Sequence, residues 1–102
     1  MTAPVPKKIE KGGQVADNDS RDGKRYTDGK LLAFADRVHA SHDTGLAAAF
    51  DAPDKTGIPA IQVGASEGKF LEILVRLSGA TKIVEVGTLA GYSAIRMARA
   101  LP

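Results

Sequence analysis

The sequence contains no cysteine and no tryptophan, and its aromatic residues are limited to three Phe and two Tyr. Without cysteine, disulfides and thiolate metal sites are excluded, and a reducing compartment such as the cytoplasm is expected. No apolar run approaches the roughly 20 residues of a membrane span, so we expect no membrane segment. Fourteen basic and twelve acidic residues leave a formal charge of +2, which gives no general electrostatic case for nucleic acid.

What remains is the composition of one small globular domain. The chain has 102 residues, of which 43% are hydrophobic and 25% are charged. Residues 1–27 hold few apolar side chains beyond Val5, Ile9 and Val15. Such a segment buries too little surface to offset its ordering entropy, so it is predicted to be a flexible polar tail. The folded domain is therefore expected over residues 28–102.

The first expected helix begins after Asp28, which is a favourable capping residue. Leu31, Ala35 and Val38 then recur at helical spacing and predict a helix to about Ser41. A second short helix is expected over residues 46–50. Residues 51–59 contain two prolines and a glycine and are predicted to be a loop.

Two histidines, His39 and His42, lie three residues apart near the end of the first helix. A metal pair is one interpretation, but no third ligand is evident nearby. A capping or solvent role is favoured over a ligand role.

The third expected helix spans residues 67–78, with Ser66 as its N-cap and Gly79 at its exit. Four large apolar side chains follow the i, i+3, i+4, i+7 pattern, which predicts one buried face. They are Phe70, Ile73, Leu74 and Leu77.

A strand, a glycine turn and a helix are predicted in succession after Gly79. Residues 82–86 are β-branched and apolar apart from Lys82 and Glu85, as in a buried strand. Gly87 and Gly91 follow, and helix formers begin at Tyr92. This arrangement directs free backbone N–H groups and a helix start at the strand's carboxyl end, where a carboxylate or phosphate is favoured.

The order helix, strand, helix is typical of one unit of a parallel α/β sheet. A single apolar strand would expose both hydrogen-bonding edges if it had no partner. We therefore interpret the chain as a truncated or partial α/β protein, or as one that completes its sheet with a second copy in a homo-oligomer.

The residues that carry a family resemblance lie in two runs. The first is Ile61-Gln-Val-Gly-Ala-Ser-Glu-Gly-Lys-Phe-Leu, and the second contains Glu-x-Gly-Thr-x-x-Gly-Tyr-Ser from Glu85 to Ser93. Together they resemble the amino-terminal half of class I S-adenosylmethionine-dependent O-methyltransferases of the catechol and caffeoyl-CoA type. The resemblance covers about residues 28–102 and implies a Rossmann-like methyltransferase fold.

The resemblance implies a cofactor site for S-adenosylmethionine. The backbone at Val63 and the hydroxyl and N–H of Ser93 would hold the methionyl end, and Glu85, Gly87 and Thr88 would line the same pocket. For each of these residues a purely structural role is the alternative. Val63 then belongs to the core, and Gly91 and Tyr92 serve packing.

The activity implied is methyl transfer to a hydroxyl of a catechol-like or other phenolic small molecule. The family resemblance also implies a divalent cation, usually Mg²⁺, and a lysine that assists deprotonation. The resemblance places those groups downstream, and none is assigned to this chain. The 102-residue chain is therefore expected to lack methyltransferase activity alone.

Two other interpretations remain open. One is an NAD(P)-binding Rossmann module, although its Gly-x-Gly-x-x-Gly fingerprint differs from the spacing of Gly87 and Gly91. The other is a non-enzymatic helical interaction domain, in which residues 28–102 form a small bundle without a strand.

Overall fold

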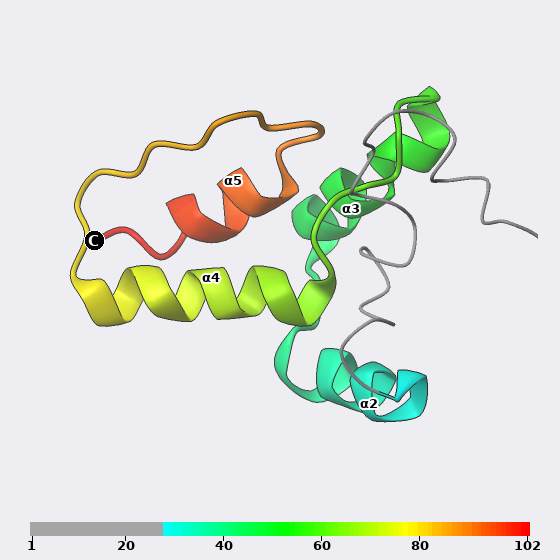
Figure 1. The fold of residues 1–102 in the computed structure, drawn as a ribbon, viewed down its shortest axis with the longest axis horizontal. Coiled ribbons are helices and arrows are strands. Elements are labelled where there is room, and N and C mark those ends of the chain that lie inside the picture. The colour runs from blue at the N-terminus through cyan, green and yellow to red at the C-terminus, as the bar shows by residue number, and fades with distance from the viewer. Residues whose placement is uncertain (1–27) are drawn as a thin grey trace, which may run out of the picture.

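The computed structural model describes residues 28–102, and the tail predicted over residues 1–27 lies outside the described residues. Four helices follow one another in the described part: α2 (Gly29–His39), α3 (Thr44–Thr56), α4 (Ala65–Ser78) and α5 (Tyr92–Ala98). Helices α4 and α5 lie side by side and run in the same direction, joined by a long extended connection (Figure 1). None of the described helices is long and apolar enough to cross a membrane.

Two aspartates begin the first two helices. The Asp28 carboxylate accepts hydrogen bonds from the backbone N–H of Lys30 at 2.8 Å and of Leu31 at 3.3 Å. Asp43 caps α3 in the same way through the N–H of Leu46 at 3.0 Å. The helix predicted from Asp28 is confirmed, since α2 ends at His39, close to the expected end.

The loop predicted over residues 51–59 is wrong in its first half. Helix α3 continues through Pro53 to Thr56 and ends at Gly57 in the left-handed conformation. Pro53 has no N–H to donate inside the helix, yet its side chain is among the most completely buried in the described part of the chain. Burial of the ring therefore outweighs the lost hydrogen bond, an effect of tertiary packing that local sequence rules omit.

Helix α4 begins two residues earlier than predicted, and Ser66 is not its cap. Gly64 is the N-cap residue, and its N–H donates to the Glu67 carboxylate at 2.8 Å. Ser66 instead donates its backbone N–H to Asp36 of α2 at 3.0 Å, and its hydroxyl bonds the same carboxylate. The predicted exit at Gly79 is confirmed by its left-handed φ of 64°.

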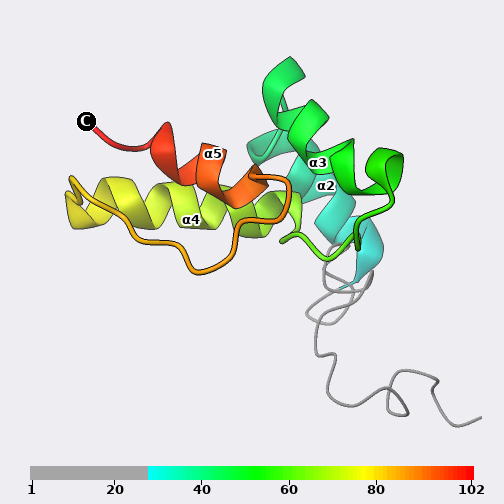
Figure 2. The ribbon, with the colours of Figure 1, turned by 90° about the horizontal axis from the view of Figure 1, so that it is seen from above.

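The core forms around Tyr92, the first residue of α5, which is 1% exposed. Leu46 and Ala49 of α3 are the buried residues that pack with it. Phe50, Val63 and Ile95 complete the cluster as partly buried neighbours. The start of α5 is thereby fixed between α3 and the loop that precedes α4, as the view from above shows (Figure 2).

The predicted strand over residues 82–86 is not formed in the described part of the chain. The segment is extended without a ladder partner, and no other described segment is a strand. Val84 and Val86 are 91% and 98% exposed. A strand requires a neighbour that accepts from its N–H groups and donates to its C=O groups, and residues 28–102 supply none.

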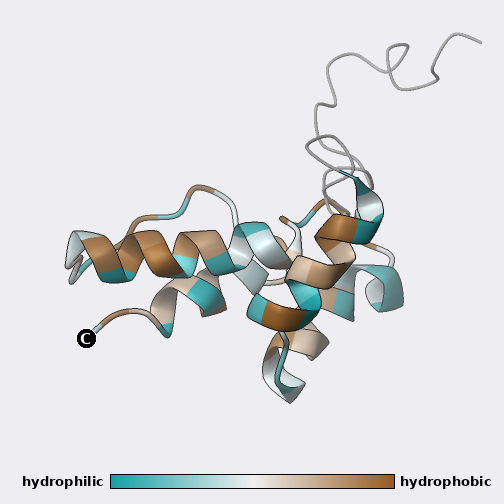
Figure 3. Ribbon diagram, turned by 90° about the horizontal axis from the view of Figure 1, so that it is seen from below, coloured by the Kyte–Doolittle hydropathy of each residue, from teal (hydrophilic) through white to brown (hydrophobic). Residues whose placement is uncertain are grey.

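The apolar face predicted on α4 is also largely exposed. Phe70 is 59% and Leu77 79% exposed, whereas Val75 and Gly68 on another side of the helix are buried. Apolar segments recur along the outside of α4 and α2 in Figure 3. The pattern is that of helices that normally cover a sheet, with the sheet missing from the described residues.

Candidate functional site

A cavity of about 390 Å³ opens where the glycine turn meets the loop before α4. Its lining comes from three places: residues 61–63, residues 85–89 and the first two residues of α5. All five residues predicted to bind a cofactor line it, namely Val63, Glu85, Gly87, Thr88 and Ser93. The structure thus brings together residues that lie up to 30 positions apart in the sequence, although their role as cofactor ligands stays a prediction.

The turn after residue 86 has an unusual backbone. Gly87, Leu89 and Gly91 have positive φ angles of 79°, 55° and 83°. The N–H of Gly91 donates to the carbonyl of Thr88 at 2.8 Å and closes the turn. Left-handed residues alternating with ordinary ones are typical of backbone turns that bind anions through their N–H groups, although the N–H of Gly91 is already used within this turn.

Leu89 is the non-glycine residue of this set. A left-handed conformation at a residue with a branched side chain costs free energy of order 1 kcal/mol or more. Because helix α5 has only seven residues, its dipole adds little to the turn's own N–H groups. The turn, rather than the helix that follows, therefore provides most of the anion-attracting character predicted for this place.

Glu85 and Ser93 meet across the mouth of the turn. The Ser93 hydroxyl donates to the Glu85 carboxylate, which joins the extended segment to the first turn of α5. Glu85 is exposed rather than buried, so the expectation of a buried strand-end acid is wrong. A carboxylate acceptor and a hydroxyl donor side by side are the two groups that a zwitterionic amino-acid end requires.

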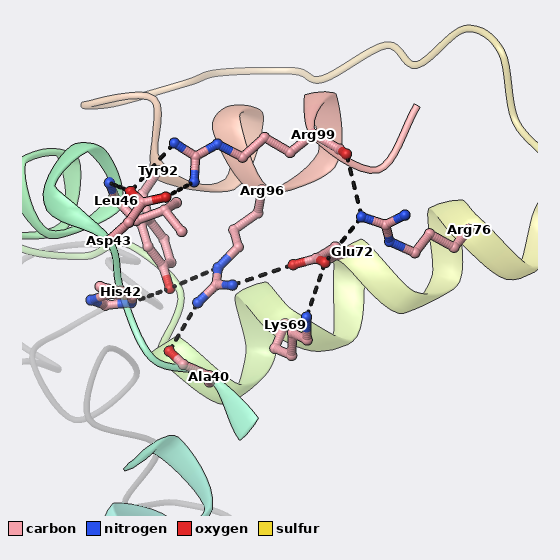
Figure 4. A network of polar contacts seen from close by, with 10 residues as sticks. All are labelled: Ala40, His42, Asp43, Leu46, Lys69, Glu72, Arg76, Tyr92, Arg96 and Arg99. Atoms are coloured by element: carbon pink, nitrogen blue, oxygen red, sulfur yellow. Dashed lines mark hydrogen bonds and ion pairs between the residues drawn. The ribbon is translucent and has the colours of Figure 1, made fainter. Parts of the chain in front are cut away.

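Tyr92 serves packing and does not open onto the cavity as a free ligand group. Its hydroxyl lies 2.7 Å from His42 Nε2 and accepts from Arg96 Nε at 3.4 Å (Figure 4). Its ring meets Phe50 edge-on, with centroids 5.0 Å apart. Burial raises the pKa of Tyr92, so the phenol stays protonated.

Five residues of the cavity wall were not predicted as cofactor-binding residues: Ile61, Gln62, Val86, Leu89 and Tyr92. Gln62 is 6% exposed, and its side-chain N–H donates to the carbonyl of Phe50. Its Oε1 has no hydrogen-bond partner among the described residues. An unpaired buried acceptor of this kind costs about 1–3 kcal/mol. In the sequence, the signal that could have identified Gln62 is its position as a polar residue directly before Val63.

The two histidines do not form a metal pair. His42 is engaged with Tyr92, and within residues 28–102 no three His, Asp or Glu side chains are grouped to hold an ion. Burial lowers the pKa of His42, and the nearby Arg96 guanidinium acts in the same direction. The imidazole is therefore neutral and structural.

A comparison with models of protein families shows which family has this sequence around the cavity. The model of the O-methyltransferase family matches residues 37–102, which contain the whole cavity. The chain belongs to the O-methyltransferase family. This family is dependent on S-adenosylmethionine and has a Rossmann-like fold, of which residues 28–102 show only the helical part.

Individual relatives agree with this assignment. The chain is 53% identical over 60 residues to a catechol O-methyltransferase of Niastella koreensis. The aligned region covers 59% of this chain and 27% of the relative. It is 43% identical over 67 residues to a catechol O-methyltransferase of Mycobacterium tuberculosis, covering 66% of this chain and 30% of the relative. A maize caffeoyl-CoA O-methyltransferase is 50% identical over 38 residues, covering 37% and 15% of the two chains. The match thus spans less than a third of each relative's length.

Family membership also explains the two exposed apolar features of the fold. In a Rossmann-like sheet the extended segment before a glycine turn pairs with neighbouring strands, and the helices on either side cover the sheet. Residues 82–86 have the composition of such a strand but no partner within the described O-methyltransferase residues.

Proposed function

We propose that this chain carries the donor-binding part of an S-adenosylmethionine-dependent O-methyltransferase that acts on a hydroxyl of a phenolic small molecule. The observation that carries the proposal is that Val63, Glu85, Gly87, Thr88 and Ser93 line one cavity. Names of the relatives support the phenolic acceptor, since they are a catechol and a caffeoyl-CoA O-methyltransferase.

The residues of the cavity suit the methionyl end of that donor. Its carboxylate would be held by the Ser93 hydroxyl and by backbone N–H groups of the turn. Its ammonium group would take the Glu85 carboxylate as acceptor, in place of the Ser93 hydroxyl that Glu85 now binds. The bound donor supplies a methyl group on a sulfonium, which is a good leaving group.

The contribution of these residues to catalysis is positioning. Holding the amino-acid end at the turn fixes the direction from which the methyl carbon is presented, and such orientation accounts for a large part of many rate enhancements. The role proposed for these residues is therefore to bind and orient the methyl donor.

Calorimetric titration with S-adenosylhomocysteine and, separately, with NAD tests the proposal. We expect S-adenosylhomocysteine to bind, and Ser93→Ala to weaken it by about fivefold to tenfold, because one hydrogen bond to a charged group is lost. Ser78→Ala is the matched control, since Ser78 bonds Val75 at the other end of α4. Tighter binding of NAD would instead favour a nicotinamide-dinucleotide module, and no binding of either would favour a helical interaction domain.

A further inference from the structure

A second cavity, of about 450 Å³, lies between the α2–α3 connection, α4 and α5. It shares no lining residue with the cavity at the glycine turn. Most of its wall is charged or polar: Ser41, His42, Asp43, Leu46, Lys69, Glu72, Arg76, Arg96 and Arg99. Figure 4 draws these residues with the exception of Ser41.

Positive charge exceeds negative charge in this wall. Glu72 accepts from Lys69 at 2.9 Å, from Arg96 at 3.3 Å and from Arg76 at 3.5 Å. One carboxylate is therefore shared by three cations. Asp43 is paired with the fourth, Arg99, which leaves a surplus of two positive charges with His42 neutral.

Arg96 contributes a charge that is fixed in place. Its side chain is 4% exposed and donates from Nη2 to the carbonyl of Ala40 at 2.9 Å. A second bond runs from Nε to the Tyr92 hydroxyl at 3.4 Å. A buried guanidinium held on several sides cannot turn toward solvent, so its field acts on the cavity at all times.

Arg76 and Lys69 are less constrained. Arg76 reaches Glu72 at 3.5 Å and the Arg99 carbonyl at 3.4 Å, both long contacts, and its side chain is 58% exposed. Lys69 is about one third exposed. Both side chains have N–H groups beyond those used in these contacts and can turn them toward a molecule in the cavity.

We propose that this cavity binds a phosphoryl group, either inorganic phosphate or a phosphate ester, with Arg76 and Lys69 as the direct ligands. A phosphate ester or phosphate carries a charge of about −1.5 to −2 near neutral pH, which matches the surplus of two cations. The planar fork of Arg76 offers paired donors to two phosphate oxygens. Ser41 lines the same wall, and its hydroxyl would add a neutral donor.

The test is a titration of the ¹⁵N-labelled chain with sodium phosphate at constant ionic strength, followed by amide chemical shifts. We expect saturable shifts in residues 41–43 and in the facing turns of α4 and α5. Arg76→Gln and Lys69→Gln should each weaken binding by about fivefold, the effect of one exposed charge pair. Because Arg76 is exposed and weakly bonded, its replacement leaves the fold available for measurement.

Lys55→Gln and Arg37→Gln are matched controls, since each removes one positive charge outside the cavity. They should leave phosphate affinity unchanged. The proposal would be overturned if the control variants weakened phosphate binding as much as the cavity variants do. It would also be overturned if the same amide chemical shifts grew linearly with added chloride, because both results would show a response to net charge alone. Glycerol 3-phosphate binding more tightly than inorganic phosphate would identify an ester as the ligand, and equal affinity would identify the phosphoryl group by itself; both results support the site.

Discussion

Gly68 lies where α4 passes closest to the ring of Tyr92. A Cβ at this position would stand 2.9 Å from Tyr92 Cε1 and 3.1 Å from its hydroxyl oxygen. Tyr92 is 1% exposed, and its hydroxyl is held by His42 and Arg96, so the ring cannot easily move away from α4. The absence of a side chain at Gly68 is therefore a packing requirement.

We expect Gly68→Ala to lower the free energy of unfolding by about 1 kcal/mol. Alanine gains about 1 kcal/mol in helix propensity, but the overlap costs about 1–3 kcal/mol. Gly29→Ala in α2 is the control, since no atom lies within 4 Å of a Cβ there. Urea unfolding of both variants measures the two free energies of unfolding. If Gly68→Ala is as stable as Gly29→Ala, α4 can shift away from the ring and the prediction is wrong.

His42 makes the stability of the chain depend on pH. Its ordinary pKa is 6.5, and burial followed by the charge of Arg96 lowers the pKa in the folded chain. Three carboxylates act weakly in the opposite direction: Asp51, Asp36 and Asp43. The folded chain therefore binds this proton at a lower pH than the unfolded chain does.

The sign of the effect follows from linkage. The contribution of His42 is fully present above pH 6.5 and is lost as the pH falls from 6.5 through the lower pKa of the folded state. His42→Gln, which keeps a donor and acceptor near Tyr92, should remove this part of the slope between pH 7 and pH 5. His39→Gln is the matched control, since it replaces an exposed histidine of α2. Unfolding curves at several pH values measure the difference, and an unchanged slope in His42→Gln would refute it.

At the scale of elements, Arg96 joins three segments of the chain. It bonds Glu72 of α4 and the carbonyl of Ala40, and it belongs to α5. We expect Arg96→Met to cost about 3 kcal/mol, because Glu72 loses its most buried partner and the Ala40 carbonyl loses a donor. Arg76→Met, which removes only an exposed partner of Glu72, should cost less than about 0.5 kcal/mol. Similar losses in both variants, by thermal or urea unfolding, would show that burial of Arg96 adds nothing.

For the extended segment, residues 82–86, substitutions are expected to have little effect on the free energy of unfolding. With Val84 and Val86 almost fully exposed, the double change Val84→Thr and Val86→Thr should alter the free energy of unfolding by less than about 0.5 kcal/mol. The same change in a paired, covered strand would cost far more, since two buried methyl groups would be replaced by hydroxyls. A loss above about 2 kcal/mol would therefore show that the segment is paired and covered in solution, whether by a second copy or by another part of the chain.

Three helix ends were predicted correctly from single residues, whereas the start of α3 after Asp43 was missed although the same capping rule applies to it. Asp28 begins α2, Gly79 ends α4, and Gly91 precedes α5, each by a local rule of capping or positive φ. Pro53 was not predictable, because its burial against other elements decides the outcome. The prediction of Ser66 as an N-cap was wrong for a related reason. Its hydroxyl bonds Asp36, which is 30 residues away in the sequence, and a local capping rule does not consider such distant partners.

At the scale of the whole molecule, the glycine turn and its neighbours were predictable as a group but their surroundings were not. The motif from Glu85 to Ser93 places a carboxylate and a hydroxyl on either side of one turn, and the structure has them in contact. The second cavity depends on Glu72 and Arg76, which are four residues apart on α4, and on Arg96 and Asp43, which come from other elements and have no sequence spacing that links them to α4. Such a cluster follows from tertiary packing, which sequence periodicity does not encode.

The exposed side of α4 provides the last prediction. Phe70 and Leu77 stand 59% and 79% exposed, although the spacing that contains them is that of a buried face. An apolar surface of this kind binds the dye ANS, so the wild-type chain should enhance its fluorescence while remaining folded.

The double variant Phe70→Ser and Leu77→Ser should weaken this fluorescence and change the free energy of unfolding by less than about 1 kcal/mol, because both side chains are already in water. Val75→Ser is the control, since Val75 is 8% exposed and its replacement should destabilise the chain and increase dye binding. If the wild-type chain fails to bind the dye, the face is covered in solution. The double variant should then unfold more easily, because each serine would remove apolar packing of the kind that holds a helix against a sheet.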